Sequence, residues 1–177
     1  VTTTTDAIRN RPAELLQCML TLGSINKGRA SIQLGAGEMK QMKSFGYKRS
    51  EGLPRMEDML RLVSKLLKAN GPISYQGNFW TYENTYIGSQ RPETLPEFWA
   101  LGGGPKLIDL ATSYADGFVS VYPWAFRNPE EWANLVAGMK KDLVQKEHDP
   151  EKFTFGLWPA CVIHDGTDDL DAMLDHP

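Results

Sequence analysis

The segment "ASIQLGAGEMKQ", residues 30–41, joins a strand pattern to a cluster of small residues. Ala30 to Leu34 is typical of a short strand, which runs into Gly35 to Gly37 and then into the carboxylate of Glu38. A backbone without Cβ atoms lets a planar or phosphorylated ligand approach and leaves amide N–H groups free to donate. The segment therefore predicts a ligand site at a strand end, although glycines after strands also serve as simple turns.

A second glycine cluster lies further along the chain. Gly102 to Gly104 follow another strand pattern, and Pro105 opens a helix at Lys106. The N-terminus of a helix offers unpaired N–H groups and a positive dipole end, which suit a phosphate group. Each cluster alone is equally explained as a turn, but two clusters after successive strands favour a cofactor site.

Helix and strand patterns alternate along the chain, which opens in what looks like the end of a strand. This alternation predicts an α/β fold with a parallel sheet and crossover helices, built as one domain over residues 1–177. A polar, glycine-punctuated loop is expected at residues 39–53, and either a small hairpin or an extended excursion at 73–84. The further strands are expected at 30–34, 97–101, 116–124 and 152–164, and the helices at 12–22, 54–69, 106–115, 128–149 and 168–176.

The composition limits the classes of partner. Nineteen basic and 22 acidic residues give a net charge of −3, so neither nucleic acid nor an anionic membrane is expected as a partner. No apolar run approaches the roughly 20 residues of a transmembrane helix. Cys18 and Cys161 lie in separate apolar segments without metal-ligand spacing, so we expect two buried, reduced thiols, no metal site and a cytoplasmic location.

Four ordered blocks resemble the bacterial-luciferase-like flavin and deazaflavin oxidoreductases, and most of all their coenzyme F420-dependent branch. This branch includes methylenetetrahydromethanopterin reductases and phthiodiolone ketoreductases. The resemblance implies a TIM barrel, of which this chain covers the end of strand 3 through strand 7, so we expect a fragment of a longer (β/α)8 polypeptide. The blocks are "RPAELLQCMLTLGSINKGRASIQLGAGE" (11–38), "FGY" (45–47), "LPRMEDMLRLVSKLL" (53–67) and "WALGGGPKLIDLATSYADGF" (99–118).

The resemblance also implies cofactor contacts. Two threonines fall at a strand bulge behind the cofactor ring, two small residues contact the ring, and two glycines hold its phosphate. Glu38 matches an acid beside the reacting carbon, where partial burial would raise its pKa for proton donation; the alternative is a solvated loop carboxylate. The six cofactor-binding residues implied are Thr2, Thr3, Ala36, Gly37, Gly103 and Gly104.

The substrate side is implied to lie past the sixth barrel strand. Ser120, Tyr122 and Trp124 are the residues placed there. Trp124 stands about where the phosphosugar-specific enzymes of the branch have a lysine, so a small molecule more apolar than a phosphosugar is expected.

The function that follows is hydride transfer between coenzyme F420 and a carbonyl- or alcohol-type substrate. One alternative is an FMN-dependent monooxygenase of the same fold. Another is a noncatalytic barrel fragment that associates through its exposed sheet edges. A homo-oligomer is expected, and the isolated 177-residue chain can be inactive because it cannot close a barrel alone. The substrate and the direction of transfer are left open.

Overall fold

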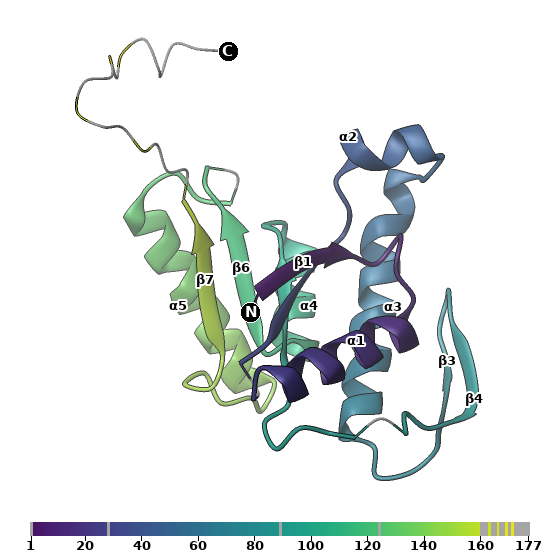
Figure 1. The fold of residues 1–177 in the computed structure, drawn as a ribbon. Coiled ribbons are helices and arrows are strands. Elements are labelled where there is room, and N and C mark those ends of the chain that lie inside the picture. Colours follow the sequence, from purple (N-terminus) through teal and green to yellow (C-terminus); the bar gives the residue numbers. More distant parts are fainter. Residues whose placement is uncertain are drawn as a thin grey trace.

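The computed structural model describes residues 2–27, 29–88, 90–123 and 125–159, together with residues 163, 166, 169 and 171. Helices and strands alternate through the described residues, as the sequence predicts (Figure 1). The strands are β1 (Thr2–Asp6), β2 (Ser31–Gly35), β3 (Ile73–Gln76), β4 (Thr81–Thr85), β5 (Glu97–Leu101), β6 (Gly117–Val121) and β7 (Thr154–Trp158). The helices are α1 (Pro12–Ile25), α2 (Met39–Met42), the 3₁₀ turn η1 (Lys43–Phe45), α3 (Arg49–Lys68), α4 (Pro105–Tyr114) and α5 (Pro129–Gln145).

Five strands form one parallel sheet in the order β1-β2-β5-β6-β7. Apart from the β3–β4 hairpin, each strand lies beside the next strand of the chain. A doubly wound sheet reverses its strand order at a switch point, whereas a barrel adds each strand on the same side of the previous one. The described sheet contains no reversal, and its order is that of consecutive barrel strands.

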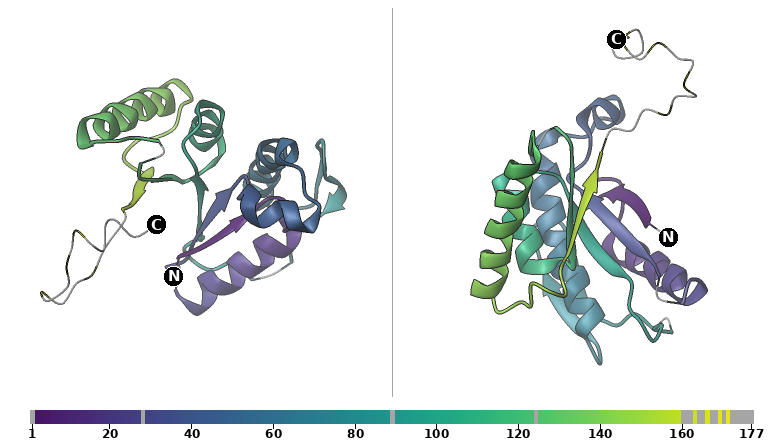
Figure 2. Two further views of the ribbon diagram at one scale, coloured as in Figure 1. Left: turned by 90° about the horizontal axis from the view of Figure 1, so that it is seen from above. Right: turned by 90° about the vertical axis from the view of Figure 1, so that its left-hand side faces the viewer.

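The helices α1, α3, α4 and α5 lie along one side of the curved sheet (Figure 2). Apolar residues at helical spacing on these helices meet the alternate apolar residues of the strands. The core between the two layers includes Leu16, Leu34, Met59, Phe98 and Phe118, all almost fully buried. The strand positions between these residues face the other side of the sheet.

Two helices extend beyond their predicted ends. The helix α1 continues past Gly23 to Ile25, and Gly23 is buried where Pro92 and Pro96 approach it. The helix α3 begins at Arg49, so Pro54 lies inside it rather than at its start. Proline removes one helical hydrogen bond, but the carbonyl that loses its donor belongs to Ser50, which is exposed and can bind water.

Most local signals are confirmed. β3 and β4 pair as an antiparallel hairpin, which selects the hairpin over the extended excursion, and β5 has the predicted bounds. Asn128 caps α5, because its side-chain oxygen accepts a hydrogen bond from the Glu131 N–H at 2.8 Å. The expected loop at 39–53 contains α2, η1 and the first turn of α3, and the predicted helix at 168–176 lies almost entirely outside the described residues.

The expected burial of Cys18 is wrong. Its neighbours Leu16 and Met19 face the core, and a helix turns about 100° per residue, so position 18 falls on the solvent side of α1. Cys161 lies outside the described residues. Within the described part of the chain, the length and hydropathy of the helices do not allow any of them to span a bilayer.

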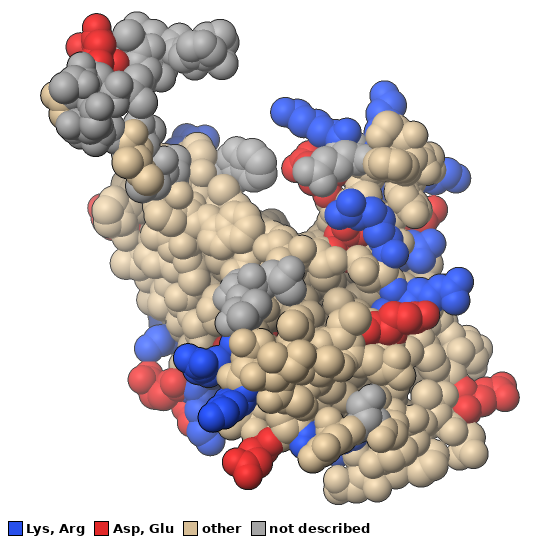
Figure 3. All heavy atoms as spheres, in the orientation of Figure 1, with Lys and Arg blue, Asp and Glu red and all other residues tan. Residues whose placement is uncertain are grey.

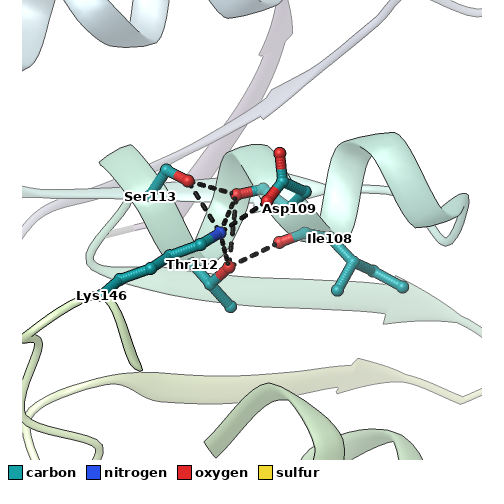
Figure 4. Close-up of polar contacts among 5 residues, drawn as sticks. All are labelled: Ile108, Asp109, Thr112, Ser113 and Lys146. Carbon is teal, nitrogen blue, oxygen red and sulfur yellow. Dashed lines mark hydrogen bonds and ion pairs between the residues drawn. The ribbon is translucent and has the colours of Figure 1, made fainter. Parts of the chain in front are cut away.

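A lysine joins α5 to α4 (Figure 4). The ammonium group of Lys146, just after α5, donates to the carbonyl and the carboxylate of Asp109, at 2.9 and 2.7 Å. It also donates to the hydroxyls of Thr112 at 2.7 Å and Ser113 at 2.8 Å. A cation beside the carbonyl end of a helix is electrostatically favourable, and this contact fixes the position of α4 against α5.

Candidate functional site

Two glycine clusters come together at one edge of the sheet. Gly35 pairs with Asp6 of β1 on one side and with Leu101 of β5 on the other. Because the three strands are parallel, the segments that follow Gly35 and Leu101 emerge at the same carboxyl edge. This is the edge at which parallel α/β proteins bind ligands.

The cluster before α4 leaves an open helix N-terminus. A Cβ atom on Gly103 would lie 2.5 Å from the Cβ of Ala125, so this close approach requires glycine. A Cβ atom on Gly104 would meet nothing within 4 Å. Among the described residues, no acceptor is found for the N–H groups of Gly103, Gly104 or Lys106. Free donors, open space and a positive dipole end fit a phosphate group.

The cluster after β2 is less open. Gly37 has a φ angle of +95°, which favours glycine, and its missing Cβ would lie 3.1 Å from Ile8 and 3.5 Å from Met42. Ala36 is partly buried and packs against the hydrophobic core. The chain's own side chains therefore occupy one side of this turn, and the cofactor contacts of Ala36 and Gly37 stay predictions.

Glu38 is exposed at this edge, so the partial burial expected for it is not found. Its carboxylate accepts a hydrogen bond from the backbone N–H of Lys40 at 3.3 Å, and its carbonyl accepts one from Met42 at 3.0 Å. The side chain thus lies at the start of α2, in contact with solvent. A role in proton transfer stays a prediction.

The structure does not bring Thr2 and Thr3 to the glycine edge. They pair with Ser31 and Ile32 at the beginning of β2, and the register is continuous to the end of β1, so the predicted strand bulge is not found there. At about 3.3 Å per residue, Thr3 lies roughly 10 Å along the strand from Asp6. Thr2 and Thr3 would have to make their predicted cofactor contacts from the half of β1 that lies away from the glycine edge.

The three predicted substrate residues do not form one surface. Ser120 is buried and lies two residues after Phe118 on β6, so it is on the same face of the sheet as Phe118, whose ring packs in the core beneath the helices. Tyr122 is 44% exposed just after β6, and its ring centroid lies 6.0 Å from that of Phe126. Trp124 lies outside the described residues.

Asp6 is a buried carboxylate at the carboxyl edge that the sequence interpretation missed. It is 3% exposed, and it accepts hydrogen bonds from the N–H groups of Ile8 and Arg9, both at 2.9 Å. The Arg9 guanidinium completes the set with an ion pair at 2.7 Å. The signal was present in "TTTTDAIRN", where an acid ends a threonine-rich strand and an arginine follows three residues later. The carboxylate holds the turn beside Gly35 in a fixed shape.

A metal centre finds no support in the part of the chain that the structure describes. No group of three or more histidine, cysteine, aspartate or glutamate residues could hold an ion there. The chemistry of this edge is that of backbone donors, a rigid acid–arginine turn and aromatic rings.

Comparisons with known proteins agree with this fold. A phthiodiolone/phenolphthiodiolone dimycocerosates ketoreductase of Mycobacterium tuberculosis is 24% identical over 178 residues, which cover 97% of this chain and 45% of the relative. An F420-dependent secondary alcohol dehydrogenase in complex with an F420-acetone adduct superposes with a TM-score of 0.75 at 22% identity, over 88% of this chain and 48% of that one. A riboflavin lyase with modified FMN and riboflavin superposes with a TM-score of 0.73 at 14% identity, over 92% and 41%.

The chain spans about half the length of the proteins that it matches. The expected fold class, part of a luciferase-like TIM barrel, is confirmed by the strand order and by these superpositions. The family model described as luciferase-like monooxygenase matches residues 1–176. The chain therefore belongs to the bacterial luciferase-like family.

Proposed function

We propose that the chain forms the phosphate-binding half of an oxidoreductase that uses coenzyme F420 to transfer hydride to or from a carbonyl- or alcohol-type substrate. The observation that carries the proposal is the open N-terminus of α4 at the carboxyl edge of a parallel sheet, where free N–H groups surround Gly104. Phosphate groups bind at such ends because donors and dipole act together. The deazaflavin supplies the hydride chemistry when bound.

The residues of this chain hold and orient the cofactor in the proposal. The N–H groups of Gly103, Gly104 and Lys106 bind its phosphate. The Asp6–Arg9 turn keeps the neighbouring loop rigid, which limits the entropy lost on binding. Glu38 is proposed to exchange the accompanying proton, since its carboxylate lies at the same edge and is open to a ligand.

The relatives support a ketone-type substrate and F420. The mycobacterial relative is a ketoreductase, and the alcohol dehydrogenase was solved with an F420-acetone adduct. The exposed ring of Tyr122 supports an apolar substrate rather than a phosphosugar. A flavin is the second candidate, because the riboflavin lyase has a similar fold and was solved with modified FMN.

Absorbance titration with F420 and with FMN tests the proposal. We expect the protein to bind F420. Gly104→Glu should weaken this binding at least about tenfold, because its carboxylate would repel the cofactor's phosphate at a site that no other group fills. Gly138→Glu is the matched control, since Gly138 on α5 also has nothing within 4 Å of its missing Cβ. Tight FMN binding without F420 binding would favour the flavin. Equal binding by both variants would remove the α4 N-terminus from the site.

A further inference from the structure

A basic and aromatic segment lies directly after the candidate site. "KQMKSFGYKR", residues 40–49, carries Lys40, Lys43, Lys48 and Arg49, and no acid occurs from residue 39 to residue 50. The net charge of the whole chain is −3, so this segment is a strong local exception. The overall charge led us to expect no membrane partner, but the distribution of charge in space leads to a different inference.

The segment presents its side chains to solvent. Every residue from Lys43 to Ser50 is exposed, and Phe45 is 73% exposed although it is fully apolar. Met42 is almost fully buried and anchors the segment to the body of the protein. A turn at Gly46, with a φ angle of +80°, separates Phe45 from the start of α3. An apolar ring is thus held on an anchored, protruding turn.

The cations of the segment are not neutralised within the described structure. Arg9, Arg55 and Arg61 elsewhere form ion pairs with nearby acids. Lys40, Lys43, Lys48 and Arg49 form no ion pair with any residue that the structure describes, and the nearest acid after them in sequence pairs with Arg55. Figure 3 shows blue side chains gathered over α2 and the start of α3. The segment from residue 39 to residue 50 therefore carries a net positive charge, with Glu38 and Glu51 at its two ends.

We propose that the surface formed by Lys40, Lys43, Phe45, Lys48 and Arg49 docks on an anionic lipid bilayer. Cations attract the negative headgroups, and an aromatic ring among them partitions into the interface. Each lysine or arginine near such a surface strengthens binding about fivefold. Single-stranded nucleic acid is a poorer fit, because its binding sites track the backbone along a groove, whereas Phe45 (73% exposed) and Tyr47 (37% exposed) stand among the cations on one protruding turn.

The docked orientation brings the candidate site toward the lipid. Glu38 and Gly37 immediately precede the segment, so the carboxyl edge of the sheet lies beside the docking surface. An apolar substrate dissolved in the bilayer could then reach this edge without crossing water. The docking proposal itself does not depend on which cofactor the protein uses.

Co-sedimentation with vesicles tests the proposal. The protein should sediment with phosphatidylcholine vesicles that contain about a third phosphatidylglycerol, should not sediment with phosphatidylcholine alone, and should be released as salt shortens the Debye length. The double variant Lys43→Glu/Lys48→Glu should bind at least about 25-fold more weakly. Phe45→Ala should bind about tenfold more weakly, because the ring that would enter the lipid interface is lost.

Matched variants control for charge and for apolar area. Lys27→Glu/Lys141→Glu makes the same charge change at two other exposed positions, one just after α1 and one on α5. This control variant should bind the vesicles as the unmodified protein does. Ile25→Ala removes a side chain that is 71% exposed and should also have no effect. Equal losses in test and control variants, or no sedimentation with anionic vesicles, would overturn the proposal. Binding of single-stranded DNA through the same lysines without vesicle binding would overturn it as well.

Discussion

The carboxylate of Asp58 on α3 accepts a hydrogen bond from the hydroxyl of Tyr75 on β3. Its second oxygen accepts from the N–H groups of Phe79 at 2.8 Å and Trp80 at 3.3 Å. Asp58 is 3% exposed, so three donors from the hairpin converge on one buried charge. This carboxylate fixes the β3–β4 hairpin against α3.

Removing this carboxylate should destabilise the protein. Asp58→Ala is expected to lower the free energy of unfolding by about 2 to 4 kcal/mol, because buried donors are left without an acceptor. Urea unfolding measures the change. Glu57→Ala is the control, since its carboxylate is exposed and pairs only with Arg61 on the same helix. A loss no larger than that of the control would show that water replaces Asp58 at no cost.

The pH dependence of stability should depend on Asp116. Loss of hydration around its carboxyl group raises the pKa of Asp116, although the residue as a whole is exposed and the Phe98 N–H donates to the carboxyl at 2.9 Å. A raised pKa in the folded state gives stability that is present below the unfolded pKa of about 3.9 and is lost as the pH rises through the folded value. Asp116→Asn should therefore flatten the loss of stability from acid to neutral pH. Thermal unfolding at several pH values measures this effect, with Asp142→Asn as the control. The same pH dependence of stability in both variants and in the unmodified protein would contradict the prediction.

The lysine contact between α4 and α5 should contribute measurably to stability. Lys146→Met keeps most of the aliphatic chain but removes the ammonium group that four oxygens accept from (Figure 4). We expect a loss of about 1 to 2 kcal/mol in the free energy of unfolding. Lys141→Met, at an exposed position of α5, should change it by less than about 0.5 kcal/mol. Equal effects of the two variants would contradict the prediction.

The proposed proton exchange should depend on Glu38. In the cofactor-loaded protein, Glu38→Gln is expected to lower kcat about 100-fold or more, since a positioned acid or base contributes that much, and to leave F420 affinity unchanged. Glu83→Gln on β4 is the control, as its side chain is also exposed but lies on the hairpin. Steady-state turnover with F420 measures the effect. Unchanged turnover would remove Glu38 from the mechanism.

The outer strands of the described sheet should promote self-association. β1 and β7 each pair on one side only, with β2 and β6. Leu157 and Trp158 on β7 are each 42% exposed. Size-exclusion chromatography should show a species larger than the 19.8 kDa monomer, and Leu157→Lys should reduce its amount because charge on an edge strand disfavours pairing. Ile25→Lys on α1 should not do so. A compact monomer would contradict the prediction of a homo-oligomer.

The local sequence determined most of the elements. Alternation of helical and strand patterns predicted the parallel sheet, and the turn residues placed both ends of β5. Asn128 and Pro129 marked the start of α5, because a cap acts within one turn of its own helix. These signals depend on neighbours along the chain, so no tertiary contact was needed to interpret them.

Only the tertiary structure decided how the residues of the edge are used. Whether Gly37 is open depends on Ile8 and Met42, which reach it from other elements. The face on which Ser120 lies depends on the side of the sheet that the helices cover, which a single strand does not encode. Asp6 gained its role from the fold around β1, because its burial beside Gly35 depends on the pairing of β1 with β2. Burial and electrostatic potential are sums over residues that are distant in sequence, and they exist only after the chain has folded.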